Sequence, residues 1–206
     1  MKDTIRSYNK DQWEELLFSL RERSKPATVM AVFDTGIARR EIIKELHAAL
    51  PELQFHNVTL PAKRLPSLSD YLRNKLKDLQ PNSNFIRDFV HIQGLEKHLF
   101  TRRDGELKPG PLARKINMER ETLFHKLPAI LFFSTDRESV RNLSQQAPDF
   151  WDWVGYFFEF QTPSQLRSSL EVPSYSPRDF LARDYKANRK KTVQQLRGRL
   201  NTMNQN

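Results

Sequence analysis

Five short apolar runs alternate with amphipathic stretches between residues 27 and 160, and this alternation limits the fold more than any other feature of the sequence. The runs lie at residues 27–35, 53–60, 89–95, 129–133 and 156–160. Continuous apolar runs of this length are typical of strands that are buried on both faces. The alternation of strands and helices predicts an α/β domain with a mostly parallel, open sheet of about five strands flanked by helices.

Apolar residues at helical spacing predict the helices between these strands. We expect them at residues 9–23, 37–50, 65–79, 112–126 and 136–146. Proline follows each of the first three and is expected to end it, because proline cannot continue a helix. Residues 101–111, rich in arginine, glycine and proline, are predicted to form a loop.

The character of the sequence changes after the last apolar run. Residues 178–206 hold eight basic and two acidic residues, a difference of +6 out of the net +9 of the whole chain. Apolar residues in this segment lie near helical spacing, which predicts a basic amphipathic helix. We therefore expect an α/β domain at residues 1–165, a linker at 166–177 and a helical tail at 178–206.

Composition narrows the class of protein. A length of 206 residues with 38% hydrophobic residues suits one ordinary domain with an appendage. The absence of cysteine excludes disulfides and thiolate chemistry and fits a reducing compartment. The polar N-terminus and the lack of any apolar run of ~18 residues predict a cytoplasmic protein that does not enter the membrane.

The turn after the first strand is where a nucleotide-binding α/β protein would hold phosphate. Such a loop needs the pattern G-x-x-x-x-G-K-[ST], in which backbone amides wrap the phosphate and the lysine neutralises it. Here residues 34–40 read DTGIARR, with one glycine and no Gly-Lys-Ser/Thr. Arg39 and Arg40 remain the only phosphate-binding candidates in this stretch, and a plain strand–helix turn is the favoured interpretation.

Other catalytic patterns are also missing from the sequence. The third run offers Gln93 and, just beyond it, Glu96 where an active NTPase needs an acidic residue for magnesium. The five histidines show no metal-ligand spacing, and His91 is expected to be a packed strand residue. No G-x-S-x-G elbow is present. We therefore expect no catalytic residue, no cofactor and no metal site.

Four short motifs together resemble a known family. The chain from about residue 10 to about residue 160 resembles the P-loop NTPase-like domain of bacterial STAND-type conflict and defence proteins, which are often fused to tetratricopeptide repeats. The matching motifs are the Gly-Leu-Glu at 94–96, the helix bearing Asn117, Arg120 and Glu121, the Ala-Pro-Asp-Phe-Trp at 147–151, and the Phe-Glu-Phe at 158–160.

The resemblance implies a P-loop NTPase-like fold acting as a signalling or scaffold module in an antiviral defence assembly. The phosphate loop is degenerate, which favours a non-enzymatic adaptor or regulatory subunit over an ATPase. No repeat sensor or effector domain is recognisable, so we expect protein partners to supply them. The aromatic turn near residue 150 is the expected partner anchor, through Asp149, Phe150, Trp151 and Trp153.

Two alternatives remain open. The chain is a nucleic-acid-binding protein if its basic tail binds a phosphate backbone. The tail residues expected to bind nucleic acid, or an acidic partner instead, are Arg189, Lys190, Lys191, Arg197 and Arg199. It is a nucleotide-binding enzyme if the atypical turn at residues 34–40 does hold phosphate.

Overall fold

The structure is a computed structural model that describes residues 4–23, 25–61, 65–77, 79, 87–103, 106–164 and 166. The chain divides into two units, residues 1–163 and 164–206, and the first contains all of the elements below. Apart from Leu166, the predicted linker and the basic tail, with Arg189, Lys190, Lys191, Arg197 and Arg199, lie outside the described residues.

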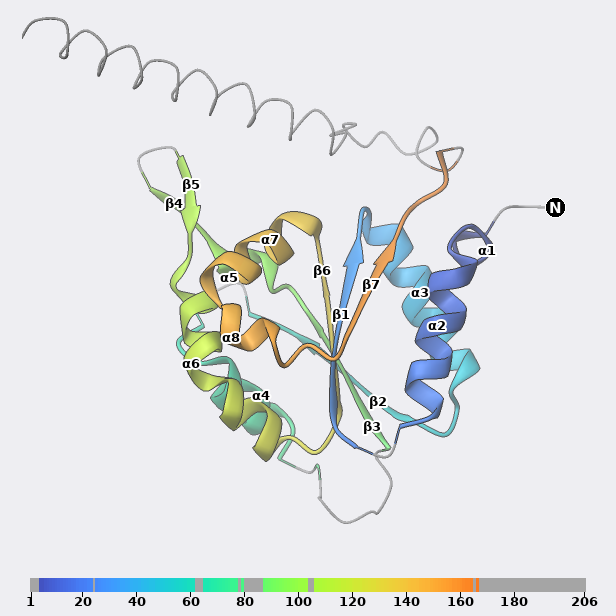
Figure 1. Cartoon of the computed structure of the whole chain (residues 1–206), viewed down its shortest axis with the longest axis horizontal. Helices are drawn as coiled ribbons and strands as arrows, with labels where there is room; N and C mark the ends of the chain where they lie inside the picture. The colour runs from blue at the N-terminus through green and yellow to red at the C-terminus, as the bar shows by residue number, and fades with distance from the viewer. Residues whose placement is uncertain are drawn as a thin grey trace, which may run out of the picture. The chain divides into compact units, whose positions relative to one another are not determined.

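The first unit is built on a five-stranded, fully parallel sheet (Figure 1). Its strands are β1 (Ala27–Phe33), β2 (Gln54–Thr59), β3 (Asp88–Gln93), β6 (Ile130–Thr135) and β7 (Tyr156–Phe160), in the order β2-β3-β6-β1-β7. With the five strands of this sheet numbered 1 to 5 along the chain, this order is 2-3-4-1-5. The α/β class predicted from the sequence, with a parallel sheet of five strands flanked by helices, is confirmed.

Helices cover both faces of the sheet (Figure 1). One face carries α1 (Ile5–Tyr8), α2 (Lys10–Arg21) and α3 (Gly36–Ala49). The other carries α4 (Leu68–Lys75), α5 (Glu96–Leu99), α6 (Pro111–Lys126), α7 (Arg137–Gln146) and α8 (Pro148–Trp151). β1 and β6 are buried along their whole length, which explains their continuous apolar sequences.

The residues that begin the helices are those that local chemistry predicts. Thr35, Ser67 and Asp136 each accept a hydrogen bond from a backbone amide in the first turn of α3, α4 and α7. Gly94, at φ 90°, makes the bend between β3 and α5, a conformation in which a side chain would be strained.

Two sequence predictions are corrected by the structure. The predicted loop at residues 101–111 contains most of an antiparallel hairpin, β4 (Phe100–Arg103) and β5 (Glu106–Pro109). The helix predicted at residues 65–79 is shorter and covers Leu68–Lys75. Leu65 and Leu76 lie outside the helix but still pack in the apolar core, so the apolar pattern was longer than the helix itself.

Candidate functional site

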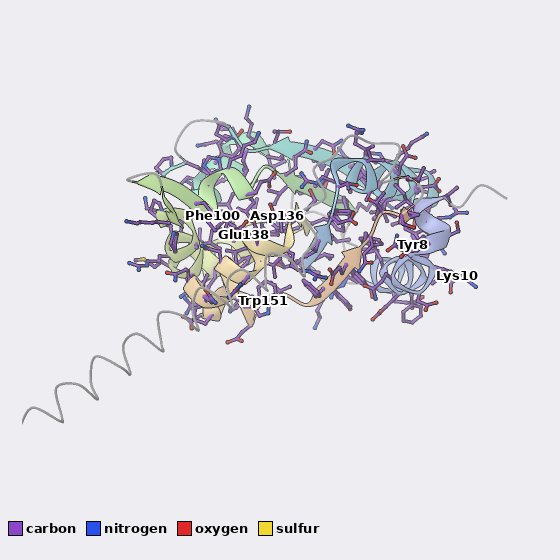
Figure 2. All side chains as sticks on the ribbon, turned by 90° about the horizontal axis from the view of Figure 1, so that it is seen from above. Tyr8, Lys10, Phe100, Asp136, Glu138 and Trp151 are labelled. Atoms are coloured by element: carbon purple, nitrogen blue, oxygen red, sulfur yellow. The ribbon has the colours of Figure 1, made fainter. Side chains whose placement is uncertain are left out.

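The strand order points to the carboxyl ends of β1 and β6 as the place for a binding site. The chain leaves β1 toward α3 on one face and leaves the neighbouring β6 toward α7 on the other face. Open α/β sheets bind ligands in the crevice at such a switch point. Figure 2 views the molecule from above and labels Asp136, the residue that begins α7 at this end of β6.

The turn between β1 and α3 consists of only Asp34 and Thr35. The hydroxyl of Thr35 accepts the backbone N–H of Ala38 at 3.1 Å, so it takes up one of the amides at the start of α3. A phosphate loop needs a longer run of residues between strand and helix to present several free amides. The turn is therefore a side-chain-capped helix start.

The carboxylate of Asp34 binds the segment that follows β7. Its two oxygens accept the backbone N–H of Thr162 at 3.0 and 2.9 Å, and one accepts the Thr162 hydroxyl at 2.7 Å. The hydroxyls of Thr35 and Thr162 are 2.6 Å apart. This network ties the end of β7 to the β1–α3 turn and places a negative charge beside the start of α3.

Two of the sequence candidates for phosphate and magnesium, Arg39 and Glu96, are engaged with each other. Arg39 on α3 lies 3.6 Å from Glu96 of α5, and both side chains are mostly buried, at 19% and 26% exposed. Gln93, at the end of β3, donates to the Thr59 hydroxyl on β2 at 2.7 Å. The structure thus brings together Arg39 and Glu96 as an ion pair that bridges α3 and α5.

Beneath this pair lies a buried polar network that spans three strands. His91 of β3 is 4% exposed; its Nδ1 lies 3.1 Å from the Asn57 side-chain oxygen on β2, and its Nε2 lies 2.8 Å from the Ser134 hydroxyl on β6. Burial, and secondarily the positive charges of Arg39 and His47, lowers the pKa of His91 from 6.5 to about 4. The histidine is therefore neutral at physiological pH.

The motifs at residues 117–121 and 147–151 meet in space. The Asn117 side chain on α6 accepts the backbone N–H of Phe150 at 2.9 Å and donates to the Asp149 carboxylate at 3.1 Å. Arg120 lies 3.6 Å from the same carboxylate. These contacts fix α8 against α6, so the motif residues have a structural role that the sequence alone did not reveal.

The four predicted partner-binding residues divide by exposure. Phe150 is fully buried, with its ring 6.0 Å from that of Phe133, so its assignment as a surface contact is corrected: it is a core residue. Asp149 and Trp153 are exposed, Trp153 at 39% and with its ring 6.0 Å from that of His125. Trp151, labelled in Figure 2, is partly buried, and its ring lies 6.1 Å from that of Phe157.

The sequence reasoning missed the residues that cover the β7 edge of the sheet. The Asn9 side chain accepts the Gln161 N–H and donates to the Gln161 carbonyl, both at 2.8 Å. Gln12 accepts the Glu159 N–H at 3.0 Å. These pairs are about 150 residues apart in sequence, so no local pattern signals them. Tyr8 and Lys10, labelled in Figure 2, mark the same helix junction, which lines a recess of about 640 Å³ with Phe157.

The opposite edge of the sheet, β2, carries a second recess that the sequence did not predict. It is a groove of about 400 Å³ between β2 and α4, lined by His56, Asn57, Val58, Thr59, Tyr71, Lys75 and Leu76. Among the described residues, no group of three or more histidine and acidic side chains is placed to hold a metal ion. No helix in the same part of the chain is long and apolar enough to cross a membrane.

Comparison with known proteins finds similarity in structure but not in sequence. No protein-family model and no curated protein sequence matches the chain. The solved structures similar to it include the ORC2 protein of Aeropyrum pernix with ADPNP and ADP, at 12% identity, TM-score 0.47 and coverage of 76% of this chain and 47% of that one. The ADP form of ORC2 is similar at 12% identity and TM-score 0.48, and the alignment covers 85% of this chain and 56% of that one.

A third similar structure is Rif2 in complex with the C-terminal domain of Rap1, at 15% identity and TM-score 0.45. That alignment covers 88% of this chain and 64% of Rif2. The chain spans about half the length of the ORC2 chains that it matches.

Proposed function

We propose that this chain is a non-enzymatic adaptor or regulatory subunit of a multiprotein bacterial defence or signalling assembly. The observation that carries the proposal is the two-residue β1–α3 turn, whose Asp34 carboxylate is bound to Thr162. The motif resemblance at residues 94–160 supplies the class of assembly. Protein partners that carry effector or repeat domains are part of the proposal.

Charge at the turn supports the loss of nucleotide binding. A triphosphate needs cations and free amides at the start of α3. The turn offers instead the carboxylate of Asp34, and the amide of Ala38 is already bound to Thr35. A carboxylate at this position repels phosphate, which opposes nucleotide binding here.

The residues that stand where an NTPase would hold phosphate and magnesium are also engaged elsewhere. Arg39 faces Glu96 across 3.6 Å, so a phosphate would have to displace a carboxylate from this guanidinium. Gln93 stands at the end of β3, and its amide donates to Thr59. A neutral amide is a poor ligand for magnesium compared with a carboxylate. Together these contacts favour a scaffold over a hydrolase.

Calorimetric titration tests the proposal directly. We expect ATP or GTP with Mg²⁺ to give no saturable heat of binding with the full chain. The same titrations are run on Arg39→Ala and on Arg21→Ala, a matched change at an exposed arginine of α2. Saturable nucleotide binding that Arg39→Ala weakens and Arg21→Ala leaves unchanged would overturn the proposal in favour of a nucleotide-binding enzyme.

A further inference from the structure

The two edges of the main sheet differ in how their backbone groups are used. At β7, the side chains of Asn9, between α1 and α2, and of Gln12 on α2 take up the outward N–H groups of Glu159 and Gln161 and the carbonyl of Gln161. The Asn9 carboxamide pairs with the Gln161 backbone much as a neighbouring strand would. This edge is closed to strand addition over the residues where the two side chains bind.

The outward groups of β2 follow from the pairing with β3. The backbone N–H groups of Gln54 and Leu60 donate to carbonyls on the β3 side. The even-numbered residues of β2 therefore direct their backbone N–H and C=O groups toward β3. Phe55, Asn57 and Thr59 therefore direct their backbone N–H and C=O groups outward. Within the described part of the chain, the contact to these groups is a single hydrogen bond, from the Tyr71 hydroxyl to the Thr59 carbonyl at 3.2 Å.

The groove between β2 and α4 has the form that strand addition requires. An extended peptide can pair with a strand edge while its side chains enter a groove between that strand and a neighbouring helix. Here the outward backbone of β2 forms one wall, and Tyr71, Lys75 and Leu76 form the other. Its volume of about 400 Å³ is enough for a few side chains of such a peptide.

Charge in the groove indicates the kind of peptide. Lys75 is exposed and makes no ion pair among the described residues, whereas the neighbouring Arg73 is paired with Asp70 at 2.8 Å. Asp88 is paired with His56 at 2.7 Å. The unpaired charge in the groove is thus positive. A second copy joined edge to edge would place two such positively charged grooves on one continuous sheet and would bring no negative charge to either. An acidic partner fits better than a second copy.

We propose that the β2 edge and the groove beside α4 bind an extended, acidic segment of a partner protein, which adds to the sheet as a sixth strand. This inference rests on the proposed adaptor function and names the surface through which a partner attaches. The outward N–H and C=O groups of Phe55 and Asn57 and the N–H of Thr59 supply the pairing, and Lys75 selects an acidic side chain.

Binding of defined peptides tests the proposal. The probe is a fluorescein-labelled peptide of about nine residues, alternating threonine and valine with a central glutamate, added to the full chain. We expect saturable anisotropy, and about tenfold weaker binding when one pairing amide of the peptide is N-methylated, because one main-chain hydrogen bond is lost. Replacing the glutamate by lysine, or Lys75→Glu in the protein, is expected to weaken binding about fivefold.

Amide exchange locates the site. We expect the peptide to protect the amides of Phe55, Asn57 and Thr59 and to leave those of β7 unchanged. Lys44→Glu, the same charge reversal at an exposed position of α3, is the matched control and should not alter binding. Absence of peptide binding, insensitivity to N-methylation, or protection elsewhere would overturn this inference. So would a concentration-dependent dimer that protects the same β2 amides without peptide.

The two proposals fail in different ways. Failure of the peptides while nucleotides also do not bind would remove the β2 surface and leave the adaptor function standing. Saturable nucleotide binding sensitive to Arg39→Ala would remove the adaptor function, whatever the peptides do.

Discussion

At the scale of single residues, His91 is the clearest case of a group whose surroundings set its chemistry. The Asn57 oxygen can only accept, so Nδ1 of His91 carries the proton and Nε2 accepts the Ser134 hydroxyl. Both ring nitrogens are thereby satisfied in the neutral form. The network links β2, β3 and β6 and is satisfied in the observed register, so a slip of one strand would leave buried polar groups unpaired.

This arrangement predicts a stability that falls in mild acid. The pKa of His91 is about 4 in the folded chain and 6.5 when unfolding exposes the ring to water, so the unfolded chain binds the proton first as the pH falls. The contribution of neutral His91 to the free energy of unfolding is complete above pH 6.5. It is lost as the pH falls toward 4, and the total loss is about 3 kcal/mol. Urea unfolding of the parent and of His91→Gln across this range measures the difference in slope.

The control is His125→Gln, at an exposed histidine of α6. We expect His125→Gln to keep the pH dependence of the parent and His91→Gln to show a shallower one. Parallel pH profiles for the parent and His91→Gln would show that burial of His91 does not govern the acid sensitivity.

At the scale of elements, patterns within short stretches of the sequence predicted the strands, whereas contacts between residues far apart in the sequence were not predicted. The apolar runs located all five strands of the sheet, and β7 was predicted with its observed bounds. The hairpin of β4 and β5 was missed because its strands are four residues long, although the Asp-Gly at residues 104–105 is a typical hairpin signal. The contacts of Asn9 with Gln161 were not predictable, because the two residues are 152 positions apart.

The candidate site was predictable in type but not in arrangement. Residues 34–40 lack the phosphate-loop sequence pattern, which predicted a plain strand–helix turn. The structure shows a short turn in which Thr35 caps α3. The pairing of Arg39 with Glu96 depends on how α3 and α5 approach the same end of the sheet, which no spacing in the sequence specifies. Phe150 was predicted to contact a partner as part of the aromatic turn near residue 150, but α8 turns its side chain into the core.

The contact between α6 and α8 yields a test at this scale. Asn117→Ala removes the acceptor for the Phe150 N–H and the donor to Asp149. We expect a loss of about 1–3 kcal/mol in the free energy of unfolding, because a partly buried amide is left without a partner. Met118→Ala, at the adjacent residue and 80% exposed, should change stability by no more than about 0.5 kcal/mol. Equal effects in the two variants would contradict the structural role of Asn117.

At the scale of the whole molecule, two thirds of the net positive charge belongs to the last 29 residues of the sequence. Residues 178–206 carry +6, so residues 1–177 carry +9 − 6 = +3. The proposed functions therefore divide between two regions: a partner surface on the sheet edge, and a basic segment that can contact anions. Acidic peptide bound at β2 and nucleic acid bound by the tail would be separable, because they involve different residues.

The basic segment predicts nucleic-acid binding of a particular kind. If Arg189, Lys190, Lys191, Arg197 and Arg199 contact phosphates of duplex DNA, five counterions are released and the logarithm of affinity should fall with the logarithm of salt with a slope of about −4 to −5. Such contacts are sequence-independent, so random duplexes should bind equally. Fluorescence anisotropy with a labelled duplex, from ~50 to ~200 mM salt, measures the slope.

Deletion of residues 178–206 is expected to abolish this binding, while Lys75→Glu, which reverses one charge on the α/β domain, should leave it nearly unchanged. Retention of the salt-dependent binding after the deletion would place the contact on the domain instead. No binding of the full chain at ~50 mM salt would exclude the nucleic-acid alternative. The +6 of the tail would then favour an acidic protein as its partner, because the same charges attract carboxylates as well as phosphates.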